Sequence, residues 1–286
     1  LFTNATNAEV DYGANGIDFV SDGFDVTHSA TNNLFNVSGR TYVAWNWKAN
    51  GSGSTNTSGD VNSTVSVDTT AGFSIATATT VSSYGSFPFT IGHGLGTAPA
   101  MVIYKSRTSG GQNWWVWHKD LPNAATGRGI LLNSSGAEVN GGYFASNPAT
   151  ATTMGINAAA LINDSVVMYS FAEIEGYSSF GSYTGNGSTD GPFIYTGFRP
   201  AFVITKRTNS TSGWPIHDDK RSPYNVTEAT LYANAADAEV NPSTEDVDFL
   251  SNGFKMRGTT TARNSSGSSY IYIAFAENPF KNSNAR

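Results

Sequence analysis

The stretch LFTNATNAEVDYGANGIDFVSDGF at residues 1–24 recurs at residues 231–254 as LYANAADAEVNPSTEDVDFLSNGF. The two copies align without a gap, and Leu, Asn, Ala-Glu-Val, Asp-Phe and Gly-Phe fall in register. Each copy ends in short apolar runs around a turn dipeptide, Asp22-Gly23 or Asn252-Gly253, which is typical of a tight β-hairpin. The repeat therefore predicts more than one copy of a β-rich unit.

A second repeat links the middle of the chain to its last third. Residues 99–105, PAMVIYK, match residues 200–206, PAFVITK. This spacing of about 100 residues is too long for a solenoid repeat and suits copies of a small domain. The same alignment pairs four further residues, Trp115 with Trp214 and His118 with His217.

We interpret the chain as one half module followed by two full modules. Residues 1–49 form the second half of a module, residues 50–59 a linker of mostly Gly, Ser, Thr and Asn, and residues 60–177 and 178–286 one β module each. A half module leaves strand edges and half a core uncovered. We expect residues upstream of Leu1 to complete it, and completion by another chain is the alternative.

Short runs rich in β-branched and aromatic residues recur through the chain, bounded by Gly, Asn, Pro or Ser. They predict strands at 42–45, 101–104, 166–169, 202–204 and 270–273. Helical patterns are limited to two short candidates, 158–162 and 230–236. We predict an all-β fold of tandem antiparallel β-sandwich modules, jelly-roll or lectin-like, with an incomplete first module and about eight to ten strands in each full module.

The composition excludes several classes of protein. Charged residues make up 13% and the formal net charge is −6, which argues against a nucleic-acid partner, because phosphate binding needs clustered Lys and Arg. There is no cysteine, so disulfide scaffolds and thiolate metal sites are excluded. No apolar run approaches the roughly 20 residues of a membrane-spanning helix, so we expect no membrane insertion.

Several longer motifs follow one another in a fixed order. They are GHGLGTAP at 92–99, FGSYTGNGSTDGPFIYTGFRPAFVITKRT at 180–208, SPYNV at 222–226, DFLSNGFKMR at 248–257 and YIYIAFAENPFK at 270–281. Together they resemble a domain that is common in structural proteins of marine tailed phages, especially cyanophages. That domain belongs to large fibre-like or adhesin-like virion proteins, and the resemblance carries over no catalytic residue.

The resemblance implies a virion protein without enzymatic activity, a tail fibre or another surface appendage that mediates host attachment. Such a protein is assembled in the host cytoplasm and ends on the particle surface. By analogy with that class we expect a homotrimer, contacts with other virion proteins and with a host-surface glycan, and no cofactor. The alternatives are a capsid decoration or head-fibre protein, a glycan depolymerase and a cellular adhesin.

The candidate surface-binding residues are aromatic or histidine side chains: Trp114, Trp117, His118, Trp214 and His217. An exposed Trp could stack on a sugar, because its flat apolar face matches the C–H face of a pyranose ring. In an alternating strand Trp115 and Trp117 share one face and Trp114 takes the other. Core packing is the preferred alternative, since Trp214 repeats the position assigned to Trp115.

The sequence offers no matched set of catalytic or metal-ligating residues. A glycosidase needs two carboxylates about 5–10 Å apart, whereas Glu173 and Glu277 recur singly in successive modules, as structural hydrogen-bond acceptors would. His217 and Asp219 could share a strand face, but a metal site needs three or more converging ligands, so a polar loop is preferred. Receptor contacts are expected on three loops: 106–114, 208–214 and 261–269.

Overall fold

The computed structural model describes residues 1–12, 16–26, 35–80, 88–139, 141–157 and 163–279. Within these ranges the protein consists of β-strands, loops and two single-turn 3-10 helices, η2 (Ala124–Thr126) and η4 (Ser243–Glu245), so the all-β prediction is confirmed. The helix predicted at 230–236 is wrong, because Leu231–Tyr232 forms a short strand that pairs with Pro215 and Ile216. The helix candidate at 158–162 lies outside the described residues.

Strands β3 to β12 form one β-sandwich, here called the N-terminal sandwich. Its larger sheet has the strand order β3-β4-β5-β12-β7-β8-β9, and its smaller sheet has the order β10-β11-β6. The two sheets share a core, in which Val102 and Met168 come from the larger sheet and Phe144 and Ile156 from the smaller. The strands are β3 Ser54–Asn56, β4 Ser63–Asp68, β5 Phe73–Thr79, β6 Phe89–Gly92, β7 Met101–Ser106, β8 Trp115–His118, β9 Ile130–Leu131, β10 Phe144–Ala149, β11 Thr153–Ile156 and β12 Ser165–Phe171.

Strands β13 to β20 form a second sandwich, here called the C-terminal sandwich. A sheet ordered β13-β20-β15-β16-β17 faces a smaller sheet ordered β14-β19-β18. Their shared core includes Ile194, Val203, Phe249 and Phe254. The strands are β13 Ser178–Thr184, β14 Phe193–Tyr195, β15 Pro200–Arg207, β16 Pro215–Asp218, β17 Leu231–Tyr232, β18 Val247–Leu250, β19 Gly253–Met256 and β20 Ser269–Ala276.

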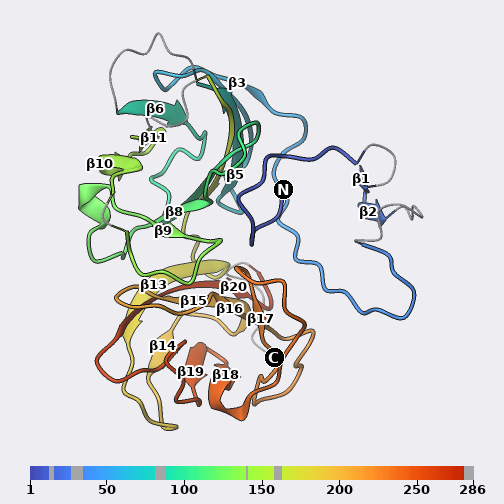
Figure 1. Cartoon of the computed structure of the whole chain (residues 1–286), viewed down its shortest axis with the longest axis vertical. Helices are drawn as coiled ribbons and strands as arrows, with labels where there is room; N and C mark the ends of the chain where they lie inside the picture. Colours follow the sequence, from blue (N-terminus) through green and yellow to red (C-terminus); the bar gives the residue numbers. More distant parts are fainter. Residues whose placement is uncertain (13–15, 27–34, 81–87, 140, 158–162, 280–286) are drawn as a thin grey trace.

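Strand β20 of the C-terminal sandwich is buried on both faces. Along β20, Tyr272 and Ala274 face the core of their own sandwich, whereas Ile271, Ile273 and Phe275 join the core of the N-terminal sandwich. Strand side chains alternate between the two faces, so a run that is apolar at every position suits a sheet packed on both sides. The two sandwiches therefore meet at an apolar junction, where β13, β15 and β20 lie next to the N-terminal sandwich (Figure 1).

Residues 1–49 repeat part of the C-terminal sandwich. The hairpin of β1 (Ile17–Val20) and β2 (Gly23–Val26) has the same register as the hairpin of β18 and β19, so Phe19 corresponds to Phe249. Phe249 is 2% exposed and Phe19 is 86% exposed. The difference arises because Phe249 packs in a core with Val203 and Tyr272 of the facing sheet, whereas Phe19 belongs to no core cluster of the described residues.

Two predictions about the first part of the chain need correction. The linker assigned to 50–59 contains β3, which pairs with β4 as the edge strand of a sheet, because Ser and Thr are compatible with strand geometry. The strand predicted at 42–45 pairs with no other described strand. Its side chains still alternate, with Val43, Trp45 and Trp47 partly buried and the residues between them exposed.

Candidate functional site

The five residues predicted to bind at the surface are buried. Trp114, Trp117, His118, Trp214 and His217 expose 5%, 6%, 0%, 0% and 2% of their surface, respectively. The surface prediction is wrong because strands β8 and β16, which carry or adjoin these residues, are buried at every position. The hydrogen bonds of the buried polar atoms show what these side chains do instead.

Trp214 fastens the C-terminal sandwich to the N-terminal sandwich. Its indole Nε1 donates a hydrogen bond of 2.9 Å to the carbonyl of Leu131, across the junction. Its main-chain N–H donates to Asn234 Oδ1, 2.8 Å away in its own sandwich. Lys206 Nζ lies 5.9 Å from the centre of the Trp214 ring and donates to the carbonyl of Ser135 at 3.2 Å. One Trp and one Lys thus hold a single loop of the neighbouring sandwich.

A second Trp and a second Lys hold the start of the chain to the N-terminal sandwich in the same way. Trp114 Nε1 donates to the carbonyl of Phe2 at 2.9 Å, and its main-chain N–H donates to Asn133 Oδ1 at 2.8 Å. Lys105 Nζ donates to the carbonyl of Thr6 at 3.3 Å. The arrangement around Trp214 therefore occurs twice in the molecule.

Both lysines of these junctions are fully buried. Burial lowers the pKa of Lys206 to about 7, and it also lowers the pKa of Lys105. A neutral amine keeps two N–H donors, and each Nζ has two carbonyl acceptors, one across the junction and one in its own loop. The junction contacts therefore need no charge on the lysine.

A main-chain hydrogen bond completes each junction. Glu9 N donates to the carbonyl of Arg107 at 2.7 Å, and Glu138 N donates to the carbonyl of Thr208 at 2.8 Å. The motif at residues 1–10, here called the opening motif, recurs at residues 231–240. These bonds reveal a further copy at residues 130–139, ILLNSSGAEV, which was not predicted from the sequence. The shared signal is Leu or Ile at the first position, Asn at the fourth and Ala-Glu-Val at the end.

The structure corrects the sequence alignment of the two full copies by one residue. Trp214 is equivalent to Trp114 rather than Trp115, because Trp114 and Trp214 make the same hydrogen bonds to matching loops. The spacing from Lys to Trp is nine residues in the N-terminal sandwich, 114 − 105, and eight in the C-terminal sandwich, 214 − 206. The loop between Lys and Trp is one residue shorter in the second case, so every residue after it is equivalent to a residue one position away from the one that the first alignment gave.

The corrected alignment makes Asp218 the counterpart of His118. Each accepts a hydrogen bond from the main-chain N–H two residues later in the chain. His118 Nε2 also lies 3.2 Å from the carbonyl of Tyr272 in β20, and Asp218 Oδ2 accepts a hydrogen bond of 3.3 Å from Trp45 Nε1. Burial lowers the pKa of His118 to about 3, so the ring is neutral. His118 thus connects the N-terminal sandwich to the C-terminal sandwich, and Asp218 connects the C-terminal sandwich to residues 1–49.

Three equivalent aromatic side chains meet where residues 1–49, the N-terminal sandwich and the C-terminal sandwich come together. These three parts of the chain are here called the first, second and third copies. Trp47, Phe171 and Phe275 share one place in the aligned repeats. Their ring centres are 6.2 Å apart for Trp47 and Phe171, 5.2 Å for Trp47 and Phe275, and 6.1 Å for Phe171 and Phe275. The three copies therefore surround this point in an approximate threefold arrangement. Figure 1 shows three lobes, of which the one that carries β1 and β2 is the thinnest.

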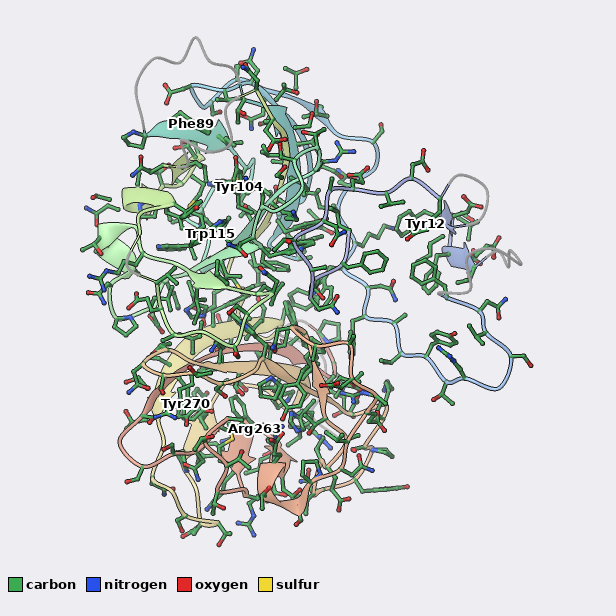
Figure 2. The ribbon with its side chains drawn as sticks, viewed as in Figure 1. Tyr12, Phe89, Tyr104, Trp115, Arg263 and Tyr270 are labelled. Carbon is green, nitrogen blue, oxygen red and sulfur yellow. The ribbon has the colours of Figure 1, made fainter. Side chains whose placement is uncertain are left out.

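His217 belongs to a buried polar cluster in the C-terminal sandwich. Arg263 Nη1 donates to His217 Nε2 at 2.6 Å, and Arg263 Nη2 donates to Glu245 Oε2 at 2.8 Å. The hydroxyl of Tyr232 also donates to Glu245, at 2.6 Å. Burial, helped by the charge of Arg263, holds the pKa of His217 well below its usual value. The cluster joins loops inside the sandwich, where Figure 2 labels Arg263.

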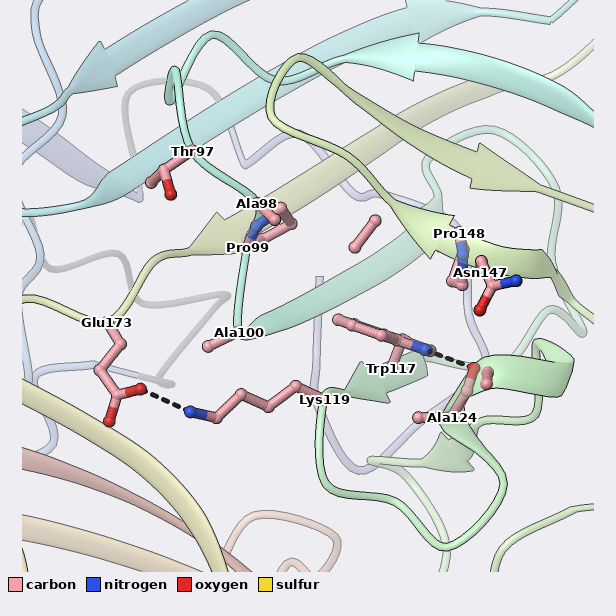
Figure 3. Close-up of a pocket in the computed structure, with 12 residues that line it drawn as sticks. Thr97, Ala98, Pro99, Ala100, Trp117, Lys119, Ala124, Asn147, Pro148 and Glu173 are labelled. Atoms are coloured by element: carbon pink, nitrogen blue, oxygen red, sulfur yellow. Dashed lines mark hydrogen bonds and ion pairs between the residues drawn. The ribbon is translucent and has the colours of Figure 1, made fainter.

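Trp117 also lines a surface depression of about 480 Å³ on the N-terminal sandwich (Figure 3). Its Nε1 donates to the carbonyl of Ala124 at 3.1 Å. Because Trp117 is 6% exposed, it offers little ring face for a sugar to stack on. The charged groups that line the depression are the Lys119 ammonium and the Glu173 carboxylate, which form an ion pair.

Each of the three loops expected to contact a receptor contains or leads to buried residues as well as exposed ones. Loops 106–114 and 208–214 lead to the tryptophans of the two junctions, and loop 261–269 places Arg263 and Asn264 in buried positions. Glu173 and Glu277 are partners in ion pairs with Lys119 and Arg199, which agrees with the structural role expected for them.

Within the described ranges, no group of three or more His, Asp or Glu side chains is arranged to hold a metal ion. No helix in that part of the chain has the length and apolar character that a membrane crossing requires.

Searches of curated proteins and of solved structures find no match. The model of a family described as a domain of unknown function, DUF7483, matches residues 1–279. Because that match covers nearly the whole chain, the protein belongs to the DUF7483 family.

Proposed function

We propose that this protein is a structural component of a tailed-phage particle, in a tail fibre or a similar surface appendage that attaches to the host. The motifs that resemble structural proteins of marine phages support this proposal. The all-β fold supports it as well, since its buried polar side chains serve to fasten one part of the chain to another. Its partners are other virion proteins, and its location is the outside of the particle.

The observation that carries the proposal is the junction that occurs twice. At each junction a Trp indole and a buried Lys, Trp114 with Lys105 or Trp214 with Lys206, hold the matching loop of the preceding copy. Copies fastened in this way form a stiff unit that keeps its shape when it is pulled or bent. An appendage needs that property, because it transmits force between the particle and a surface.

The proposal includes contact with a host glycan, and homotrimeric assembly remains a prediction of the same class analogy. The depression beside Trp117 is the place to test glycan contact, because Lys119 and Glu173 present charged groups there. Weak contacts at such sites add up when many copies act together on one particle. On a glycan array, Lys119→Ala should reduce binding, whereas Lys220→Ala, which alters an exposed lysine elsewhere, should leave it unchanged.

A cryo-EM reconstruction of the phage particle that carries this protein tests the proposal. Density for the two sandwiches on the tail or baseplate is the expected result. Density spread over the capsid lattice would instead favour the alternative, a capsid decoration protein. Purified particles that contain no peptide of this chain would rule out both.

A further inference from the structure

Two surfaces of residues 1–49 are open although their counterparts in the C-terminal sandwich are covered. There, β14 lies beside β19, and β20 lies between β13 and β15. In the first copy, Phe19 of the matching hairpin is 86% exposed, and the matching segment 42–48 pairs with no described strand. In the C-terminal sandwich, β13, β14 and β15, the strands that pair with these elements, all come from residues 178–230.

A third open surface is the last copy of the opening motif, residues 231–240, here called the open loop. The other two copies, residues 1–10 and 130–139, are each held by a Trp and a Lys of the next copy. Residues 236–240 of the open loop are all exposed, whereas the matching residues 135–139 are all partly buried. The open loop therefore has the held loops' sequence motif but lacks their cover within the described structure.

The hydrogen-bonding groups of the open loop lie at the same positions as in the held loops. Tyr232 and Ala236 carry the carbonyls that match those bound by Trp and Lys in the other copies. Within the described structure, Tyr232 O accepts one turn hydrogen bond, from Ala235, and no hydrogen bond reaches Ala236 O or Glu239 N. These are the three groups through which each held loop is bound.

Residues 1–49 contact the C-terminal sandwich at two places. The hydroxyl of Thr3 donates to the carbonyl of Ala233 in the open loop at 2.8 Å. The C-terminal sandwich also contacts the segment 42–48, through the hydrogen bond from Trp45 to Asp218 and the packing of Trp47 on Phe202. In the approximate threefold arrangement, the open loop is the end of the C-terminal sandwich that would join the first copy.

We propose that these three surfaces together bind one further polypeptide: the first half of a β module, of the same kind as residues 178–230. It adds strands beside β2 and along residues 42–48. Its own Lys and Trp, spaced as Lys206 and Trp214 are, donate to the carbonyls of the open loop. The inference is independent of the phage proposal, because it rests only on repeats inside this chain.

The two junctions within this chain show which groups the partner needs in order to bind. The partner needs an apolar strand with a lysine at its next-to-last position, followed eight or nine residues later by a tryptophan, as in 206 to 214 and 105 to 114. Main-chain pairing supplies affinity along the added strands, and buried side chains at alternate positions supply specificity. A surface that bound sugars or nucleic acid would not require this set of donors.

The test is a chain in which residues 178–230 are repeated directly before Leu1, so that the added copy joins the opening motif as Thr230 joins Leu231. Hydrogen exchange followed by mass spectrometry should slow by at least about tenfold in three places, residues 17–26, 42–48 and 236–240. A matched control carries Lys206→Met and Trp214→Phe in the added copy only. It should protect the first two places and leave 236–240 as open as in the original chain.

A second arm adds residues 178–230 as a separate peptide to the original chain, and it decides the question if the extended chain does not fold. Slower exchange at the three places in either arm supports the inference. Unchanged exchange in both arms overturns it. Slower exchange in the original chain alone, rising with its own concentration, would also overturn it, because the occupant would then be a second copy of the whole chain.

Discussion

Trp114 and Trp214 make the same hydrogen bonds in successive sandwiches: each indole N–H donates to a carbonyl of the preceding copy, and each main-chain N–H donates to an Asn of its own. Buried polar groups are costly unless they are paired, so an indole N–H aimed at one carbonyl fixes how two copies sit together. The repetition of this geometry explains why a tryptophan follows the buried lysine at nearly the same spacing in both sandwiches, nine residues in one and eight in the other.

Trp214→Phe should destabilise the protein by about 1–3 kcal/mol, because it keeps a ring but leaves the carbonyl of Leu131 with one partner fewer. Chemical denaturation measures this change. Trp114→Phe should have a smaller effect on global stability, since residues 1–10 are held at the edge of the fold. Hydrogen exchange in residues 1–10 should nevertheless become faster, and unchanged exchange there would contradict the role assigned to Trp114.

Gly253→Ala should destabilise the protein by about 1–3 kcal/mol, the cost of forcing an extra methyl group into a packed site. A Cβ at Gly253 would lie 2.1 Å from the carbonyl of Ile194, so β14 and β19 would have to separate. Gly23 holds the same place in the first hairpin, and a Cβ there meets nothing within 4 Å. Gly23→Ala is therefore the matched control and should leave the melting temperature unchanged.

Equal effects of the two glycine substitutions would show that the hairpins are in the same environment. That result would contradict the finding that the hairpin of β1 and β2 is uncovered on the side where β14 covers its counterpart.

Arg263→Leu should cost about 3–5 kcal/mol, because it leaves Glu245 buried without its cationic partner. Arg257→Leu is the control, since Arg257 pairs with Asp248 at a partly exposed position near the surface, and surface pairs contribute about 1 kcal/mol or less. Both variants are compared by urea denaturation. A loss for Arg263→Leu no larger than that for Arg257→Leu would show that the cluster is not structurally important.

Stability should fall as the pH is lowered from about 7 to about 5. Burial lowers the pKa values of His93, His118 and His217, and His217 also faces Arg263 and Arg221. The unfolded chain then binds protons below the ordinary histidine pKa while the folded chain does not, so the free energy of unfolding decreases on acidification. Each histidine contributes up to about 1.4 kcal/mol per pH unit over that range.

Thermal melts across this pH range check the sign, and His93→Gln should reduce the slope. A melting temperature that is constant or rises on acidification would show that these rings are accessible to protons in the folded state.

Much of the fold follows from local pattern. The runs at 101–104, 166–169, 202–204 and 270–273 are β-strands because alternating β-branched and aromatic residues between turn signals fit a sheet. The run at 42–45 has the same pattern but no ladder, because pairing depends on neighbouring strands and not on the segment itself.

The site was harder to predict. Trp114, Trp117 and His118 were expected at the surface because one strand in isolation cannot show what covers it. The covering groups are Phe2 at the start of the chain, Ala124 of the same sandwich and Tyr272 of the other sandwich, respectively. The loop at 130–139 went unnoticed because its similarity to the other two copies is concentrated in a few positions, chiefly Asn133 and Glu138. Those positions matter through main-chain and amide hydrogen bonds, which place weak constraints on the remaining residues.

The central claim is that one kind of junction is occupied twice and open once, and the amide groups of Glu9, Glu138 and Glu239 test it most directly. In a dilute solution of the protein, hydrogen exchange at single-residue resolution should be slow at Glu9 and Glu138, whose N–H groups bind Arg107 and Thr208, and fast at Glu239. Slow exchange at Glu239, or exchange at Glu9 and Glu138 as fast as at Glu239, would contradict the account.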